Sequence, residues 1–270
     1  MPLPRELLEA KIAELRIIDD TFARVFFDDD PECVETVLRI ILDKPDLKVV
    51  SQLALTQTQR LVHNYGGREV ILDVYAEDKS GKRYNIELQR DDRGATLRRA
   101  RLHLSLMDAR ALEKGEDPDN LPETYIVFLT ERDALNKGVT MWKAPRTFWY
   151  ADAGGEETPH APADDGSHII FVNAERAQDD PTAVGALMRD VMRKSAETME
   201  TPALKKRMNE IKNSREGKKK MCKVMEELIK EEKRLDVQNM LKMGLDKAFI
   251  MKALRLSEEQ FEELSTPLAS

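Results

Sequence analysis

Two uninterrupted apolar runs constrain the fold of this chain more than any other feature. Residues 124–130 read TYIVFLT, and residues 168–173 read HIIFVN. Apolar runs of this length without polar alternation are typical of strands that are buried on both faces, and such strands lie in sheets that helices cover on each side. Segments with the apolar periodicity of helices precede and follow these runs along the chain. This order of elements predicts an α/β fold with a mixed sheet.

Apolar periodicity and turn residues predict the other elements. We expect helices over residues 5–17 and 94–114, two short helices between 19 and 42, and an extended segment over 47–64 that leads to a turn at Gly66-Gly67. Two further strands are predicted over 68–77 and 82–90, joined by the turn DKSGK. Residues 150–167, YADAGGEETPHAPADDGS, are predicted to form a loop.

The pattern is helical from about residue 180 to the end, and the composition shifts near Pro202. We therefore divide the chain into a domain over residues 1–200 and a C-terminal helical extension over 201–270. Residues 205–220 hold eight Lys/Arg against two Glu. This basic stretch fits either a DNA-backbone contact or a solvated helix face with Met208 and Ile211 turned inward.

Two short amphipathic helices are expected after Leu241, broken at Gly244 and near Leu256-Ser257. The second, SEEQFEEL, is acidic and would repel phosphates. We therefore expect packing or homo-oligomer contacts through the C-terminal helices, and no DNA contact by this second helix.

Composition and charge exclude several classes of protein. The net charge is -7, so a nucleic-acid partner has to meet a local basic patch. No apolar run approaches the roughly 18 residues of a membrane-spanning helix, and residues 1–20 contain acids and lack the apolar core of a signal peptide. Cys33 and Cys222 lie far apart without zinc or redox spacing. We expect a cytoplasmic protein.

The hairpin over residues 68–92, REVILDVYAEDKSGKRYNIELQRDD, carries carboxylates where strands usually avoid them. If the turn is centred on Ser80, the numbers of opposed residues sum to about 160, and Asp73 lies opposite Glu87. Opposed side chains share a face with Cβ atoms about 5 Å apart, and Gln89 shares it too because it lies two residues from Glu87. A turn shifted by one residue would place the two acids on opposite faces.

Two carboxylates at this distance repel each other unless a positive charge lies beside them or one of them is protonated. Mg²⁺ prefers hard oxygen ligands and keeps several waters, so one carboxylate from each strand, completed by phosphate oxygens and water, would suit it. The same pattern fits two simpler arrangements. The polar alternation could mark a solvated face, or the acids could form ion pairs with nearby arginines.

Several segments together resemble one known family. IDDTFARVFFDD (residues 18–29) looks like its opening Asp-x-x-Phe helix, KRYNIELQR (82–90) like its Glu-x-Gln strand, and residues 98–131 like its next helix, loop and buried strand. In this order the segments resemble the PD-(D/E)XK nuclease family transposases, also called Rpn-type recombination-promoting nucleases, over roughly residues 16–200. The resemblance implies a restriction-endonuclease-like core and a metal-dependent DNA endonuclease.

The resemblance also implies roles for individual residues. Asp73 and Glu87 match the acids that hold Mg²⁺ or Mn²⁺ in the superfamily. Gln89 stands where the superfamily usually has a lysine beside the attacking water, and glutamine can hydrogen-bond water but cannot carry charge. Asp19 matches the acid of the first helix and is either a third ligand or a helix N-cap, with Asp20 as the neighbour that could replace it.

The helix after the hairpin carries arginines that suit phosphate contact. Arg99 lies at the family's arginine position and Arg98 next to it, so both are candidates for binding a substrate phosphate. Ion pairs on the surface are the alternative. His103 shares the flank of Arg99, and a lone histidine is more often a packed or surface residue than a ligand.

Two functions fit these residues best. The first is a Mg²⁺-dependent phosphodiesterase acting on DNA, in which Asp73, Glu87, Gln89 and Asp19 form the catalytic site. The second is a nuclease fold that binds DNA or a protein partner without cleaving it, which Gln89 and the acidic tail favour. A regulator that acts through residues 200–270 alone is a third, less favoured hypothesis.

Overall fold

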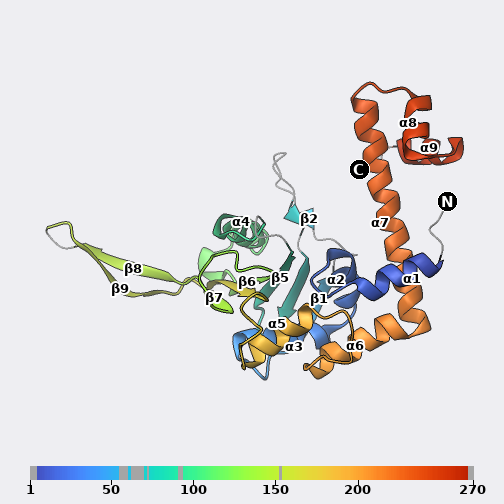
Figure 1. Cartoon of the computed structure of the whole chain (residues 1–270). Coiled ribbons are helices and arrows are strands. Elements are labelled where there is room, and N and C mark those ends of the chain that lie inside the picture. Colours follow the sequence, from blue (N-terminus) through green and yellow to red (C-terminus); the bar gives the residue numbers. More distant parts are fainter. Residues whose placement is uncertain are drawn as a thin grey trace.

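A six-stranded mixed sheet forms the centre of the molecule (Figure 1). The computed structural model describes residues 5–54, 60–61, 70–71, 73–90, 94–151 and 154–266. The strand order is β1-β4-β5-β6-β10-β7. These strands are β1 (Val49–Ala54), β4 (Val74–Asp78), β5 (Arg83–Gln89), β6 (Thr124–Thr130), β10 (Ser167–Asn173) and β7 (Met141–Lys143).

The sheet is antiparallel at its edges and parallel in its middle. Strands β1, β4 and β5 pair antiparallel, β5, β6 and β10 pair parallel, and β7 pairs antiparallel with β10. Parallel neighbours need a crossover connection, and α4 (Leu97–Asp108) lies in the one between β5 and β6. The predicted α/β fold, with a mixed sheet flanked by helices and a helical C-terminal part, is confirmed.

The two apolar runs form β6 and β10 in the middle of the sheet, and all of β6 is buried as predicted. Its side chains alternate between two packed layers. Val127 and Leu129 join the larger core, whereas Ile126 and Phe128 pack on the other face with Leu104 of α4. A strand between two layers needs apolar residues at every position, which explains the unbroken run.

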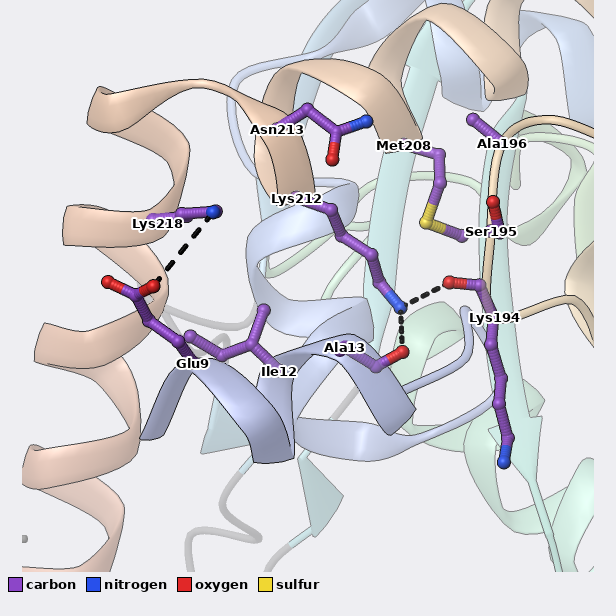
Figure 2. Close-up of a pocket in the computed structure, with 10 residues that line it drawn as sticks. All are labelled: Glu9, Ile12, Ala13, Lys194, Ser195, Ala196, Met208, Lys212, Asn213 and Lys218. Atoms are coloured by element: carbon purple, nitrogen blue, oxygen red, sulfur yellow. Dashed lines mark hydrogen bonds and ion pairs between the residues drawn. The ribbon is translucent and has the colours of Figure 1, made fainter. Parts of the chain in front are cut away.

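Helices α6 (Pro202–Asn213) and α7 (Arg215–Lys242) follow the sheet domain. Lys212 near the end of α6 is 9% exposed, and its Nζ donates hydrogen bonds to the backbone carbonyls of Ala13 and Lys194 (Figure 2). It also donates to the backbone carbonyl of Leu15. Its three N–H groups therefore tie α6 to the end of α1 (Arg5–Glu14) and to the segment after α5 (Ala183–Val191).

The basic stretch over residues 205–220 faces acids from the N-terminal part of the chain. Its ion pairs join Lys206 to Glu32, Arg207 to Asp30, Lys218 to Glu9 and Lys220 to Asp28. Met208 and Ile211 are buried, as the helix-face interpretation requires. Intramolecular ion pairs thus neutralise much of the positive charge of the stretch. This favours the interpretation as a helix face over a DNA-backbone contact.

Buried residues of α6 and of the first half of α7 belong to the main core, among them Leu204 and Met221. A separate apolar cluster around Val237, Ile250 and Phe261 joins the far end of α7 to α8 (Lys247–Leu254) and α9 (Glu258–Ser265). These are the two short helices that the sequence predicts, whereas a domain boundary at residue 201 stays a prediction. No helix in the described part of the chain has the length and apolarity needed to span a bilayer.

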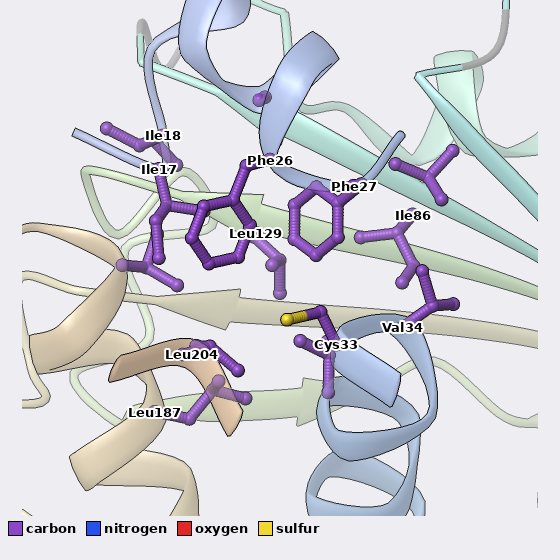
Figure 3. Packing of buried hydrophobic residues seen from close by; sticks show 14 of the residues in the cluster. Ile17, Ile18, Phe26, Phe27, Cys33, Val34, Ile86, Leu129, Leu187 and Leu204 are labelled. Carbon is purple, nitrogen blue, oxygen red and sulfur yellow. The ribbon is translucent and has the colours of Figure 1, made fainter. Parts of the chain in front are cut away.

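The larger core lies on one face of the sheet, under α2 (Asp20–Phe26), α3 (Pro31–Leu42) and α5. Figure 3 shows Phe26, Leu129 and Leu204 gathered there from three different elements. Pro31 begins α3, and Asp30 caps it by accepting a hydrogen bond from the backbone N–H of Cys33 at 3.0 Å.

The segment that the sequence predicts as a loop, residues 150–167, overlaps a β-hairpin that begins at Arg146. Strands β8 (Arg146–Ala151) and β9 (Glu157–Ala163) pair antiparallel and project from the body of the molecule (Figure 1). Every residue of β8 is exposed. A hairpin without a buried face does not need alternating apolar and polar residues. The sequence therefore lacks a strand pattern here, and its Gly and Pro residues indicate a loop instead.

Two other elements have different bounds in the structure from those that the sequence predicts. Helix α4 ends at Asp108, and turns lead from there to Gly115. The strand predicted over 68–77 is divided into β3 (Val70–Ile71), which pairs with β2 (Arg60–Leu61), and β4, which begins after Asp73. The turn expected at Gly66-Gly67 lies outside the described residues.

Candidate functional site

The register of the β4–β5 hairpin brings Asp73 and Glu87 together. Val74 pairs with Ile86, so the numbers of opposed residues sum to 160, as the sequence predicts. Asp73 lies directly before β4. Its backbone N–H donates to Glu87 Oε1 at 3.3 Å, and its Oδ2 accepts a hydrogen bond from the backbone N–H of Leu88 at 2.8 Å.

The face of β5 that carries Glu87 is covered and not solvated. Glu87 is 1% exposed and Asn85, on the same face, is fully buried. Glu87 lies beside Phe128 of β6, and Phe128 packs against residues of α4. The solvated-face interpretation is therefore excluded for Glu87.

Side chains from β5 and α4 surround the Glu87 carboxylate. Asn85 Nδ2 donates to Oε1 at 2.9 Å, His103 Nδ1 lies 3.3 Å from the same oxygen, and Arg99 Nη2 donates to Oε2 at 3.2 Å. Burial alone would raise the pKa of Glu87, but the contacts with His103, Asn85 and Arg99 together hold it below its usual value. The ion-pair arrangement is therefore present for Glu87.

Asp73 differs from Glu87 because it has no ion pair within the described residues. Burial and the charge of Glu87 raise the pKa of Asp73 well above that of an ordinary aspartate, and Asp20 adds to this effect. The hydrogen bond from Leu88 and the charge of Arg99 act in the opposite direction without balancing it. When both acids are ionised, a single arginine leaves one negative charge of the pair uncompensated.

Helix α4 supplies two of these contacts from adjacent turns. Thr96 caps the helix by accepting from the backbone N–H of Arg99 at 3.1 Å. Residues four apart lie on one flank of a helix, so Arg99 and His103 both reach Glu87. Arg99 also donates from Nη1 to Gln89 Oε1 at 3.2 Å. Its neighbour Arg98 is exposed.

Asp19 lies in a second cluster of charges. Its carboxylate accepts from the backbone N–H of Arg16 at 2.7 Å and from the guanidinium at 3.2 Å, and Arg90 Nε lies 3.2 Å from Oδ1. Glu131 pairs with Arg16 at 3.1 Å. Asp19 holds the N-cap position of α2 without a capping hydrogen bond from its side chain. Its described direct partners are thus arginines, while Asp20 pairs with Arg24 at 3.3 Å.

The donor set at the hairpin fits a hard divalent cation. The half-buried Asp73 and the buried Glu87 lie together with less than full charge compensation, and the Oδ1 atom of Asn85, on the same face of β5 as Glu87, is buried without a hydrogen-bond partner among the described residues. Among the described residues, no group of three or more His, Cys, Asp or Glu side chains is arranged to hold a metal. A cation here would have Asp73 and Glu87 as its side-chain ligands, with other oxygens completing the shell, which Mg²⁺ tolerates.

Sequence reasoning missed three contributors to these clusters. Asn85 and His103 bind the Glu87 carboxylate, and Arg90 binds Asp19. The available signals were the two-residue spacing of Asn85 from Glu87 and the four-residue spacing of His103 from Arg99. Neither spacing alone distinguishes a buried partner from a surface residue.

One of three comparisons with known proteins found a match. Residues 16–144 match the family model described as PD-(D/E)XK nuclease family transposase, and this range contains both Asp73 and Glu87. Searches of curated proteins and of solved structures found no significant match.

Proposed function

We propose, because residues 16–144 of the chain match the family model of the PD-(D/E)XK nuclease family transposases, that the protein is a metal-dependent endonuclease that hydrolyses phosphodiester bonds of DNA. The observation that carries the proposal is the pair of carboxylates formed by the half-buried Asp73 and the buried Glu87, which meet at the end of the β4–β5 hairpin. A pair with raised and lowered pKa values side by side is typical of functional sites.

In this proposal Asp73 and Glu87 hold Mg²⁺ or Mn²⁺. A bound divalent cation would neutralise charge on the scissile phosphate and lower the pKa of the attacking water. Glu87 is ready to act as a ligand because its contacts keep it ionised. Because the pKa of Asp73 is raised, protonation of Asp73 competes with cation binding, so the affinity for the cation should rise with pH.

Gln89 is proposed to orient the attacking water by a hydrogen bond. Its Oε1 accepts from Arg99 Nη1 at 3.2 Å, which leaves the amide Nε2 as a donor toward a ligand. An amide cannot accept a proton, so Gln89 positions water and does not serve as a general base.

Arg99 is proposed to contact a substrate phosphate with the N–H groups that it does not use within the protein. Three of its five donors point to Glu87, Gln89 and His103. The exposed Arg98 is proposed to make a weaker contact with the DNA backbone.

Asp19 is the third proposed ligand, and its contacts make it the weakest of the three. Arg16 and Arg90 already neutralise its charge. If it binds the cation, Asp19→Asn should weaken Mn²⁺ binding, and Asp20→Asn should leave it unchanged. The opposite result would assign the first-helix role to Asp20, whose charge acts on Asp73.

A plasmid-nicking assay with Mg²⁺ tests the proposed activity. We expect Asp73→Asn and Glu87→Gln to lower the cleavage rate about 100-fold or more, the scale on which lost electrostatic stabilisation acts. Glu77→Gln on the same strand, β4, is the matched control and should cleave like the wild type. Equal activity in wild type and Asp73→Asn, or none in either, would refute the proposal.

The ion pair between Arg99 and Glu87 favours a second candidate, a nuclease fold that binds DNA without cleaving it. In that case the arginine takes the place of the cation as the partner of Glu87. DNA affinity would then persist in Asp73→Asn with a steep dependence on salt, and Mg²⁺ would change neither affinity nor the DNA.

A further inference from the structure

We propose that His103 is a positioning residue that holds Glu87 in the orientation needed to bind a divalent cation, and that Arg99 sets the tautomer in which it does so. This inference rests on the proposed metal-dependent function. It assigns a role to a buried histidine of α4 that the sequence pattern does not distinguish from a packing residue.

The contact with Arg99 determines where His103 carries its proton. Arg99 Nε lies 3.3 Å from His103 Nε2. An arginine can only donate hydrogen bonds, so Nε2 must accept and cannot carry a proton. The proton of the neutral ring is therefore on Nδ1, which lies 3.3 Å from Glu87 Oε1 and donates to it.

The other protonation states fit this geometry less well. Asn85 Nδ2 also lies 3.3 Å from His103 Nδ1, but it donates to Glu87 Oε1 at the shorter distance of 2.9 Å, so the Arg99 contact decides the tautomer. A ring protonated on Nε2, either as the other tautomer or as the doubly protonated cation, would point an N–H group at the N–H group of Arg99. The chain of contacts therefore runs in one direction, from Arg99 through His103 to Glu87.

The two oxygens of Glu87 have different hydrogen-bond partners. Oε1 accepts from Asn85 Nδ2 at 2.9 Å and from the backbone N–H of Asp73 at 3.3 Å, and it faces His103 Nδ1. Oε2 has Arg99 as its described partner at 3.2 Å. Donors concentrated on Oε1 fix the rotation of the carboxylate and leave Oε2 as the oxygen that a cation can take.

His103 acts through Glu87 and does not itself contact a substrate. It is 2% exposed, and its ring lies 6.2 Å from that of Phe128. Outer partners of this kind typically contribute 10- to 100-fold to metal affinity.

Mn²⁺ binding to the full-length protein, measured by calorimetry, tests the inference without relying on catalysis. We expect His103→Leu to weaken Mn²⁺ binding about 10- to 100-fold. His103→Asn should restore most of the affinity, because its amide nitrogen can replace Nδ1 as a donor. His103→Gln should not restore it, because its amide lies nearer the position of Nε2. The exposed His160 supplies the control, and His160→Leu should bind like the wild type.

The outcomes separate this inference from the proposed function. If the wild type shows no Mn²⁺ binding that depends on Asp73, the proposed function itself fails. If the wild type binds and Asp73→Asn does not, but His103→Leu binds like the wild type, the inference about His103 is wrong and the proposed function stands. If His103→Leu fails to fold, the comparison of His103→Asn with His103→Gln decides, and equal losses in both would overturn the inference.

Discussion

At the scale of single residues, the site depends on two acids whose surroundings shift their pKa values in opposite directions. Glu87 is held in its ionised form by donors from β5 and α4, whereas the half-buried Asp73 has one backbone donor and a negative neighbour. A cation would remove the repulsion between them, and without one the repulsion is a cost to the folded state.

Replacing Asp73 by asparagine should therefore stabilise the metal-free protein. The raised folded-state pKa of Asp73 means that its stabilising contribution is present at low pH and is lost as the pH rises through that value. In EDTA at pH 8 we expect Asp73→Asn to raise Tm by about 2–4 °C, the shift that about 1 kcal/mol gives in a protein of this size. Thermal unfolding followed by circular dichroism measures it.

The pH dependence distinguishes this cause from a general effect of removing charge. The gain in Asp73→Asn should shrink toward zero as the pH is lowered, because wild-type Asp73 is then protonated. The exposed Asp46 provides the comparison, and Asp46→Asn should change Tm little at any pH. A gain in Asp73→Asn that is constant with pH would contradict the explanation.

The pairing of Asp73 with Glu87 could be predicted from the sequence, because a turn at Ser80 fixes the register of a short hairpin. The sequence also allows ion pairs of the acids with nearby arginines, but the choice of Arg99 as the partner of Glu87 could not be predicted. It depends on where α4 crosses the sheet, and no local pattern in the sequence encodes that position. Asp19 shows the same limit, since its position before α2 does not reveal the two arginines that neutralise it.

At the scale of secondary-structure elements, the connection from β5 to α4 positions Gln89. A Cβ atom on Gly94 would lie 2.4 Å from Cδ and Oε1 of Gln89, so only glycine allows this side chain its observed place. The contact is with the end of a flexible side chain, which can move without disturbing the core.

Gly94→Ala should thus affect cleavage much more than stability. We expect the cleavage rate to fall about 10- to 100-fold, since a displacement of about 1 Å at a positioned group costs that much, with little change in Tm. A nicking assay and a thermal unfolding curve measure the two quantities. In a Gln89→Ala background the additional Gly94→Ala change should have no further effect on rate; an undiminished effect there would show that Gly94 acts elsewhere.

The buried elements were predictable and the exposed ones were not. β6 matches its predicted range because a strand between two packed layers must be apolar throughout. The β8–β9 hairpin was missed because it has no buried face, and its strand β9 contains Pro159 and Pro162. Helix α4 stops at Asp108, earlier than its glycine signal at Gly115 indicates.

At the scale of the whole molecule, the C-terminal helices are fastened to the sheet domain by buried polar contacts. Lys212 donates to carbonyls from two other segments, and more exposed ion pairs join residues 205–220 to acids of the N-terminal part of the chain. The homo-oligomer expected through the C-terminal helices stays a prediction, which light scattering of the full-length protein would test by its mass.

Lys212→Met should loosen this attachment. The methionine fills similar space but leaves the carbonyls of Ala13, Leu15 and Lys194 without donors, at a cost of about 3 kcal/mol in the free energy of unfolding. Urea unfolding followed by circular dichroism measures the loss. The exposed Lys219 is the matched control on α7, and Lys219→Met should change stability by less than about 0.5 kcal/mol. Equal effects of the two changes would contradict the role of Lys212.

The most direct test of the central claim is a crystal of the protein soaked in Mn²⁺ and measured at an energy where manganese scatters anomalously. The account predicts one strong peak about 2.1 Å from oxygens of both Asp73 and Glu87, with Arg99 released from Glu87 Oε2. A map without a peak at these oxygens, with the Arg99–Glu87 ion pair intact in the soaked crystal, would contradict it.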